Sequence, residues 1–341
     1  MKDSNCSIPT PPIKPETPPV GQANNVAPAT TESISFAVDL LRKGEVIGLP
    51  TETVYGLAGD GLNPAALARI FEVKQRPLFD PLILHLADAE SAFALTLEAS
   101  DSARKLAAKF WPGPLTLVLR KKEIVPDLAT SGLPNVALRV PAHPVAQALL
   151  RAFAGPLAAP SANRFGRISP TDAAAVRSEL GEAVPLILDG GPCAVGLEST
   201  VLDLSGERPI LLRAGGIPLE ELEAIVGPIE RATPVDEKPL GPGQLKHHYA
   251  PRKPLRIVAD ATQIPSTATT GWLAFGAVPE SFPGVIENLS PTESLREAAT
   301  NLFRAMRTLD DDSRVEMIYV LPLPRAGLGL AINERLERAE H

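Results

Sequence analysis

Short apolar runs alternate with amphipathic segments through most of the chain. Ile34, Val38 and Leu41 stand at helical spacing in a segment that ends at Gly44, and the apolar run at 46–50 predicts a buried strand. Up to about residue 230, the pattern predicts further strands at 81–87, 115–119, 135–141, 156–160, 185–191, 199–205 and 208–213, and helices at 63–74, 100–110, 143–154 and 170–180. This alternation predicts an α/β domain built on one large mixed sheet.

Two proline-rich segments interrupt this pattern. Residues 1–30 hold seven prolines without hydrophobic periodicity, so we expect a disordered tail. Residues 231–254 hold five prolines and no core-facing pattern, which predicts a linker. Beyond it, strands are predicted at 255–259, 271–276 and 317–324, and helices at 294–309 and 330–340. The expected domains are therefore 31–230 and a small α/β C-terminal domain at 255–341.

Composition narrows the class of protein. A chain of 341 residues with 44% hydrophobic and 21% charged residues has enough apolar material for two cores. No apolar run approaches the ~18 residues that span a bilayer, and the N-terminus has no apolar signal-peptide region, so we expect a cytoplasmic protein without a membrane segment. Cys6 and Cys193 are too few for a disulfide framework or a cysteine-rich zinc site.

The net charge of −7 argues against general nucleic-acid binding, because sequence-independent binding needs a basic face. A Walker A loop and an H-E-x-x-H zinc motif are absent from the sequence. Candidate chemistry instead lies in polar stretches next to predicted strands and helices. Lys74 and Arg76 end a predicted helix, where cations commonly complement the helix dipole, but Pro77 and Pro81 would stiffen the loop that presents them. The hydroxyl-rich loop at 159–171 is typical of phosphate-binding loops and also of ordinary turns.

Several motifs follow one another along the chain: PTETVYGL at 50–57, KxRP at 74–77 with PLILH at 81–85, SAN at 161–163 with SPT at 169–171, GLESTVLD at 196–203 and LLRAGGI at 211–217. In this order they resemble the threonylcarbamoyl-AMP synthase family. The linker sequence GPGQLKHHYAP and the ending GLGLAINERLERA resemble the longer, two-domain branch of that family. The resemblance implies a YrdC-like domain, in which a large twisted mixed sheet and helices surround a concave pocket, followed by a Rossmann-like α/β domain.

The resemblance also implies an activity. Members of the family are nucleotidyltransferases that convert L-threonine, bicarbonate or CO2, and ATP into L-threonylcarbamoyl-AMP and diphosphate. A downstream tRNA threonylcarbamoyl transferase complex then modifies the adenosine next to the anticodon. Mg²⁺ is expected to bind through the ATP phosphates, without metal ligands of the protein's own, and any contact with tRNA is expected to be weak.

Site residues follow from the resemblance, position by position. The catalytic tetrad K-x-R with S-x-N falls on Lys74, Arg76, Ser161 and Asn163. The implied threonine-binding residues are Thr53, His85, Arg139, Ala159 and Ser199, and the implied ATP-binding residues are Lys74, Arg76, Asp80, Asn135, Ser161, Ser169, Arg213 and Tyr249. In physical terms, Lys74 is a point charge for phosphate, whereas the planar guanidinium groups of Arg76 and Arg139 suit phosphate and carboxylate.

Some interpretations stay open. His85 closes an apolar strand and would equally serve as a buried core histidine. Asp80 stands where the family often has asparagine, and a carboxylate beside phosphates is unfavourable unless it points away or meets Mg²⁺. The linker is expected to close over the pocket as a lid, with Tyr249 near the nucleotide. Alternative functions are an RNA-binding or ribosome-associated YrdC-like module and one part of a larger carbamoyltransferase, although the extra domains of the latter are missing.

Overall fold

The computed structural model describes residues 25–233, 235, 239–244 and 248–341. In this part of the chain, the larger sheet has eleven strands: β1 (Val26–Pro28), β2 (Ile47–Leu49), β3 (Gly56–Asp60), β4 (Ile83–His85), β5 (Leu115–Arg120), β6 (Asn135–Arg139), β7 (Leu157–Ala158), β8 (Ile187–Asp189), β9 (Thr200–Asp203), β10 (Ile210–Arg213) and β11 (Glu230–Arg231). Their order across the sheet is β1-β8-β2-β3-β7-β4-β6-β5-β9-β10-β11, with parallel and antiparallel neighbours. The sheet is mixed, as the sequence predicts.

A second sheet belongs to the C-terminal domain. Its described strands are β12 (Leu255–Ile257), β13 (Thr270–Ala274), β14 (Val285–Asn288) and β15 (Met317–Val320), in the order β12-β15-β13-β14. Every neighbouring pair is parallel. Together, the large mixed sheet and the smaller parallel sheet confirm the predicted fold class.

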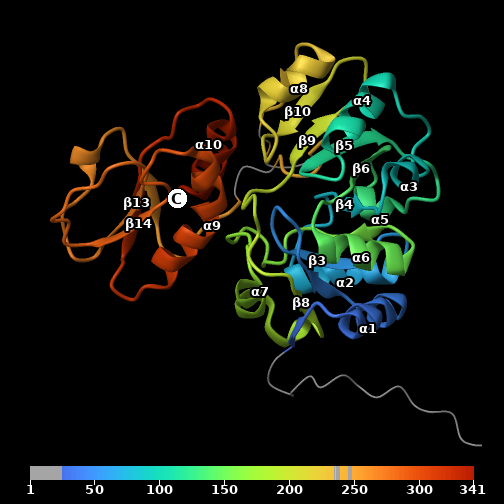
Figure 1. Cartoon of the computed structure of the whole chain (residues 1–341), viewed down its shortest axis with the longest axis horizontal. Coiled ribbons are helices and arrows are strands. Elements are labelled where there is room, and N and C mark those ends of the chain that lie inside the picture. Colours follow the sequence, from blue (N-terminus) through green and yellow to red (C-terminus); the bar gives the residue numbers. More distant parts are fainter. Residues whose placement is uncertain (1–24, 234, 236–238, 245–247) are drawn as a thin grey trace, which may run out of the picture.

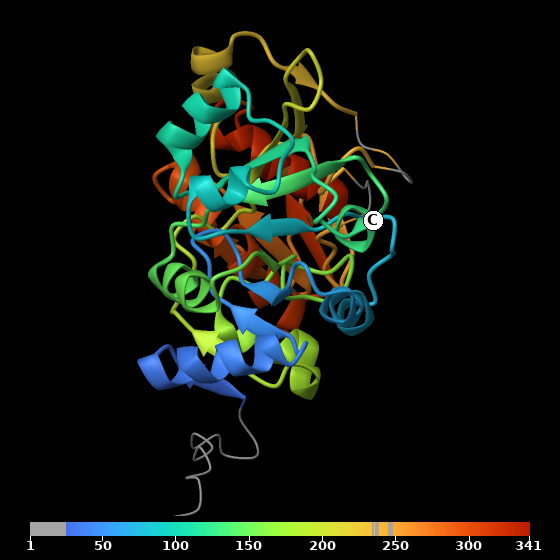
Figure 2. The same ribbon diagram turned by 90° about the vertical axis from the view of Figure 1, so that its right-hand side faces the viewer.

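Helices cover both sheets. In chain order they are α1 (Thr31–Arg42), α2 (Pro64–Lys74), α3 (Ala89–Phe93), α4 (Asp101–Phe110), α5 (Asp127–Thr130), α6 (Pro144–Phe153), α7 (Ala173–Leu180), α8 (Leu219–Val226), α9 (Leu295–Asp311) and α10 (Leu328–Ala339). In Figure 1, α9 and α10 lie between the second sheet and the larger domain. Figure 2 shows the C-terminal domain, in orange and red, behind the larger sheet. The C-terminal helices therefore face the larger domain.

Strand register brings polar residues to one place. β4 and β6 are parallel neighbours, and His85 is the direct partner of Arg139 at their carboxyl ends. β7 pairs with β4 in the opposite direction, so that Ala159 donates its backbone N–H to the carbonyl of Ile83 at 3.1 Å. Because parallel strands end at the same edge, side chains far apart in the sequence meet there.

Helix α2 aims the K-x-R motif. Asn63 caps its first turn by accepting the Ala65 N–H at 3.0 Å, and Pro64 suits the first helical position. The helix ends at Lys74, since Gln75 adopts the left-handed conformation with φ 53°. The chain therefore turns sharply between Lys74 and Arg76, so the two cations point in different directions.

The structure differs from the sequence prediction at the tail, at the linker and in one unpredicted strand of the motif region, among other places. Proline content predicts a tail up to residue 30, whereas Val26–Pro28 pair with β8 and Thr30 caps α1; residues 1–24 lie outside the described part. The linker begins after Arg231, which pairs with β10 as part of β11. β3 begins at the end of the motif at 50–57 and was not predicted, because its glycines and alanine give no strand signal. A Cβ on Gly59 would lie 3.2 Å from Ile70 Cδ1, so glycine allows α2 to pack closely on β3.

Candidate active site

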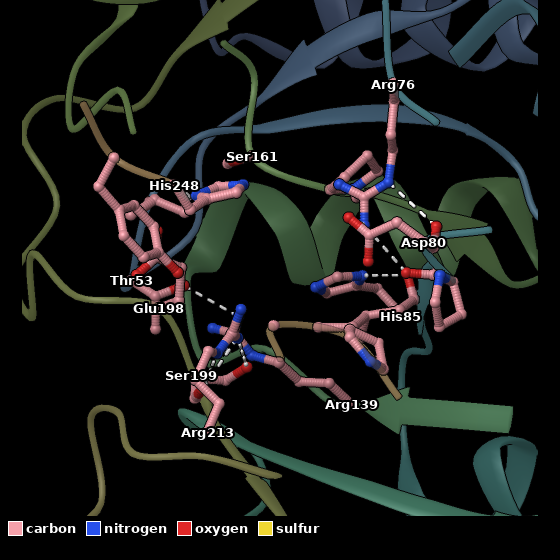
Figure 3. A pocket seen from close by; sticks show the side chains of 18 of the residues that line it. Thr53, Arg76, Asp80, His85, Arg139, Ser161, Glu198, Ser199, Arg213 and His248 are labelled. Carbon is pink, nitrogen blue, oxygen red and sulfur yellow. Dashed lines mark hydrogen bonds and ion pairs between the residues drawn. The ribbon is translucent and has the colours of Figure 1, made fainter. Parts of the chain in front are cut away.

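A cavity lined by several charged side chains opens between loops of the larger sheet, the linker and the C-terminal domain (Figure 3). Most of its walls come from the loops that follow β2, α2 and β7, from the ends of β4, β6 and β10, and from the residues just before β9. The lining residues are Thr53, Val54, Arg76, Asp80, Pro81, Ile83, His85, Arg139, Ala159, Pro160, Ser161, Glu198, Ser199, Arg213, Pro242, Gly243, His248, Tyr249 and Arg338.

Arg139 is fixed by three partners. Its Nη2 forms an ion pair with Glu52 Oε1 at 2.6 Å, its Nη1 donates to Thr53 Oγ1 at 2.9 Å, and its Nε donates to the Gly113 carbonyl at 3.2 Å. Glu52 also accepts the Ala142 N–H at 3.1 Å through its other oxygen. A guanidinium has five N–H donors, so Arg139 keeps two for a ligand in a rigid orientation. Glu52 is therefore a positioning residue that the motif analysis missed.

His85 lies beside Arg139 as a neutral side chain. Its Nδ1 lies 3.2 Å from the Ile83 carbonyl, and the ring is buried. Burial and, after it, the positive charge of Arg139 lower the pKa of His85 to about 3. Its ring is therefore a hydrogen-bonding wall of the cavity and carries no charge at neutral pH.

Arg76 and Asp80 lie side by side on one wall of the cavity (Figure 3). Arg76 Nη2 lies 2.7 Å from Asp80 Oδ2, and the Arg76 guanidinium also donates to the carbonyls of Asp80 and Pro81. The other oxygen of Asp80 is buried with no hydrogen-bond partner in the described part of the chain. Burial raises the pKa of this carboxyl group, although Arg76 and Lys74 oppose the shift.

Lys74 and Asn163 lie behind the cavity wall and hold the S-x-N loop. Lys74 Nζ donates to the carbonyl of Ser161 and, at 2.6 Å, to that of Asn163. Burial lowers the pKa of Lys74 well below its ordinary value, with Arg76 as the next cause. Asn163 donates from its side chain to the carbonyls of Arg164 and Arg167. Neither side chain is among the cavity-lining residues, so in this structure both shape the loop that presents Ser161.

Ser199 and Arg213 form a second polar wall. Arg213 donates to the Ser199 carbonyl at 2.9 and 3.1 Å and to its hydroxyl at 3.1 Å. Thr116 completes the arrangement, since its hydroxyl lies 2.7 Å from that of Ser199. Burial lowers the pKa of Arg213, and no ion pair of Arg213 occurs in the described part of the chain. Its positive charge is thus available to an anionic ligand.

Glu198 connects this wall to the C-terminal domain. It accepts the Ser169 hydroxyl at 2.6 Å and forms an ion pair with Arg335 of α10 at 3.1 Å. Burial favours the protonated form, yet Arg335, Arg213 and the Ser169 hydrogen bond outweigh it and lower the pKa of Glu198. Ser169 is therefore committed to Glu198 and lies outside the cavity lining.

The linker covers one side of the cavity with Pro242, Gly243, His248 and Tyr249. Tyr249 stacks on Phe303 of α9 with ring centroids 5.5 Å apart, and residues 245–247 of the expected lid lie outside the described part. Burial and the nearby cations lower the pKa of His248 well below its ordinary value. The His248 ring is therefore a neutral part of the wall.

Family models match almost the whole of the described chain. Residues 39–215 match the Sua5/YciO/YrdC model, described as "Telomere recombination", and residues 217–340 match the model "Threonylcarbamoyl-AMP synthase, C-terminal domain". The chain belongs to the threonylcarbamoyl-AMP synthase family. Two curated members of this family, from Pyrococcus abyssi and Bacillus subtilis, are each 40% identical to this chain over 90% of its length. The aligned regions span 93% of the P. abyssi protein and 92% of the B. subtilis protein.

A solved structure of the family has the same fold. The crystal structure of P. abyssi Sua5 complexed with L-threonine superposes with a TM-score of 0.83 at 39% identity, over 90% of this chain and 93% of that one. In this chain, no helix within the described residues is both long and apolar enough to cross a membrane. The agreement covers both domains, so the resemblance to the two-domain branch of the family is confirmed.

Ten of the residues predicted from the family motifs line the cavity: Thr53, Arg76, Asp80, His85, Arg139, Ala159, Ser161, Ser199, Arg213 and Tyr249. Four others do not: Lys74, Asn135, Asn163 and Ser169. Asn135 lies at the opposite end of β6 from Arg139 and donates to Ser205 at 2.9 Å, so the strand itself carries it away from the cavity.

The motif analysis missed Glu198, His248 and Arg338 as cavity residues. Glu198 stands inside the motif GLESTVLD, and His248 precedes Tyr249 directly, so both had a sequence signal. Arg338 stands inside the ending GLGLAINERLERA, but nothing in that amphipathic helix indicates that one of its arginines reaches a distant cavity.

Proposed function

We infer that this cavity condenses L-threonine, bicarbonate and ATP into L-threonylcarbamoyl-AMP and diphosphate. The observation that carries this inference is the charge of the walls. Four arginines, Arg76, Arg139, Arg213 and Arg338, line the cavity against the carboxylates of Asp80 and Glu198, although the chain as a whole has a net charge of −7. A basic cavity in an acidic protein selects small anions, and all three proposed substrates carry carboxylate, bicarbonate or phosphate charge.

Threonine is proposed to bind at the Arg139 end. The two free N–H donors of Arg139 suit its carboxylate, and the hydroxyls of Thr53 and Ser199 lie in the same part of the cavity for its side chain. His85 is neutral there, so it adds no charge that would compete with Arg139 for the carboxylate. The backbone at Ala159 forms the adjoining wall.

The nucleotide is proposed to bind beside Arg76, Arg213 and Tyr249, so that Arg213, which donates to the Ser199 hydroxyl, adjoins the threonine site. Phosphate oxygens would replace the backbone carbonyls and Asp80 as partners of Arg76, while Ser161, held in place by Lys74, supplies a neutral donor. No group of three or more acidic, histidine or cysteine residues suited to a metal ion occurs in the described ranges. Mg²⁺ is therefore proposed to enter with ATP, and the unpartnered oxygen of Asp80 is the protein atom that fits it.

The proposed chemistry has two steps. The threonine amine attacks the carbon of bicarbonate or CO2 and forms a carbamate, with loss of water in the case of bicarbonate and of a proton to solvent in the case of CO2. A carbamate oxygen then attacks the α-phosphorus of ATP, and the bond to the β-phosphate oxygen breaks to release diphosphate. Since both reacting groups are anionic, the chain contributes mainly alignment and neutralisation by its arginines.

The product is a reactive mixed anhydride, so an acceptor must consume it. We propose that a tRNA threonylcarbamoyl transferase complex takes it up in the cytoplasm for modification next to the anticodon, and that any direct tRNA contact of this chain is weak. The overall acidic charge supports the last point.

The test is diphosphate release by the purified chain with ATP, bicarbonate, L-threonine and Mg²⁺. Release that requires threonine and falls in CO2-depleted buffer is expected, together with threonylcarbamoyl-AMP detected by mass spectrometry. Release without threonine would contradict the proposal. Salt-sensitive RNA binding without ATP binding would instead favour the RNA-binding module.

A further inference from the structure

One of the cavity arginines comes from the C-terminal domain. Arg338 lies in the last turn of α10, and its side chain is only 8% exposed although it lines the cavity. Its Nη1 donates to the Gly243 carbonyl at 2.5 Å, while its own carbonyl accepts the His248 N–H at 3.3 Å. Arg338 thus holds both ends of the linker segment at 243–248 and reaches the cavity beside it.

Among the residues that the structure describes, the positive charge of Arg338 is poorly neutralised. Its nearest carboxylate oxygen in this set is Glu334 Oε2, at 4.0 Å from Nη2. Glu334 is shared, because the same oxygen accepts the Ala214 N–H at 3.2 Å and lies 3.9 Å from Arg335, while its other oxygen pairs with Arg231 at 3.3 Å. A nearly buried cation with so little compensation is unfavourable unless a ligand supplies negative charge.

Arg338 also faces the nucleotide end of the cavity. Arg76, Arg213 and His248 line the same cavity as Arg338, and the His248 N–H donates to the Arg338 carbonyl at 3.3 Å. After burial, the charges of Arg76, Lys74, Arg338 and Arg213 lower the pKa of His248. Arg213 touches the same glycine, since a Cβ on Gly243 would lie 2.5 Å from Arg213 Cδ. Arg213 and Arg338 therefore flank Gly243 with two incompletely paired guanidinium groups.

Arg335 fixes the helix that carries Arg338. It is fully buried, pairs with Glu198, and its guanidinium carbon lies 5.4 Å from the centroid of the Tyr249 ring. Arg335 and Arg338 are one helical turn apart, so the ion pair to Glu198 sets the position of the following turn. The C-terminal domain is thus locked to the cavity wall next to the point where Arg338 enters.

We propose that Arg338 binds the polyphosphate chain of the nucleotide, and that Arg335 is the positioning residue that places it. The active site is then completed by the C-terminal domain. The inference rests on the proposed function in that it takes ATP as the nucleotide. Arg338 would hold phosphate oxygens beyond the α-phosphate, the part of ATP that leaves as diphosphate.

The test compares nucleotides that differ only in their phosphates. Binding of a non-hydrolysable ATP analogue, AMP and inorganic diphosphate is measured by calorimetry for the native chain and for Arg338→Met and Arg338→Lys. Arg325→Met is the matched control, because Arg325 belongs to the same domain, is 60% exposed and lies outside the cavity lining.

We expect Arg338→Met to weaken binding of the ATP analogue and of diphosphate by about 10- to 100-fold, because a charge-assisted contact is lost. Binding of AMP should weaken by less than about threefold. Arg338→Lys keeps the charge and recovers part of the loss, the threonine KM stays unchanged, and Arg325→Met behaves like the native chain. If Arg338→Met folds poorly, the comparison of Arg338→Lys with Arg325→Met decides. Arg338→Lys loses only the planar guanidinium fork, and this loss must weaken binding of the ATP analogue more than binding of AMP.

If Arg338→Met loses equal affinity for AMP and for the ATP analogue, or raises the threonine KM, Arg338 only supports the linker. If this variant binds the ATP analogue, AMP and diphosphate like the native chain, the contact with phosphate does not exist. Both results overturn the inference. The binding measurement needs no turnover, so a native chain that binds ATP but releases no diphosphate would refute the proposed function alone.

Discussion

The ion pair between Glu198 and Arg335 joins residues 137 positions apart and is fully buried. Substituting each partner separately, and then both together, gives a quantitative test of how this ion pair attaches the C-terminal domain. Glu198→Gln keeps the size and the acceptor for Ser169 but removes the charge. The buried Arg335 cation then keeps only the more distant carboxylate of Glu334, at 3.9 Å, among the described residues. Arg335→Met leaves the buried Glu198 carboxylate without its ion-pair partner.

The expected cost follows from burial. Breaking a buried pair by removing one partner costs about 3–5 kcal/mol, because the remaining charge has lost both water and its partner. In the double variant neither charge remains, and we expect a loss of only about 1–2 kcal/mol, mainly from the Ala214 carbonyl that Arg335 no longer reaches. The double variant should therefore be more stable than either single variant.

The assay is guanidinium unfolding of the four chains, followed by tryptophan fluorescence. The sequence has two tryptophans, and each reports on one domain: Trp111 follows α4, and Trp272 lies in β13. Single losses that simply add in the double variant would refute the reasoning, because they would show that the two charges do not compensate each other.

Acid provides an independent check on the same pair. The pKa of Glu198 is lowered from its ordinary 4.5 in the folded chain: burial opposes the shift, but Arg335, Arg213 and the Ser169 hydrogen bond together outweigh it. Its stabilising contribution is therefore complete above that value and is lost as the pH falls through the lowered pKa. The stability difference between the native chain and Glu198→Gln should shrink in that acidic range, and a difference that stays constant would contradict this assignment.

Four further predictions concern the cavity. Lys74→Ala should raise the KM for ATP about 10- to 100-fold, because two loop carbonyls lose their donor. Arg139→Ala should raise the KM for threonine by a similar factor. An equal rise of the threonine KM in both variants would refute this division of roles. Gly243→Ala should weaken ATP binding in calorimetry, since a Cβ would meet Arg213 and the φ of 87° disfavours alanine; native affinity would contradict this. With the pKa of His85 at about 3, the threonine KM should show no titration of this ring between pH 5 and 8, and a break near pH 6.5 that disappears in His85→Gln would show the assignment to be wrong. A chain that ends at Thr233 should lose synthesis of threonylcarbamoyl-AMP, and full activity would show that the linker and C-terminal domain are dispensable.

Hydrophobic periodicity in the sequence determined the fold class and most strands and helices. Runs such as those at 115–119 and 135–141 are long and apolar enough to identify a buried strand locally. The same pattern could not reveal β1 or β3, since three backbone-paired residues and a run of glycine and alanine carry almost no side-chain signal. Ordered motifs likewise indicated which polar residues to consider, but not the direction of each side chain.

Tertiary structure alone decided those directions. Lys74 and Arg76 are two residues apart, yet the left-handed turn at Gln75 sends one behind the wall and the other into the cavity. Arg338 is the converse, a distant residue on an ordinary amphipathic helix that long-range packing brings to the site. Spacing along a chain fixes which residues share a local face, whereas the distance between separate elements depends on how they pack, and no local pattern encodes it.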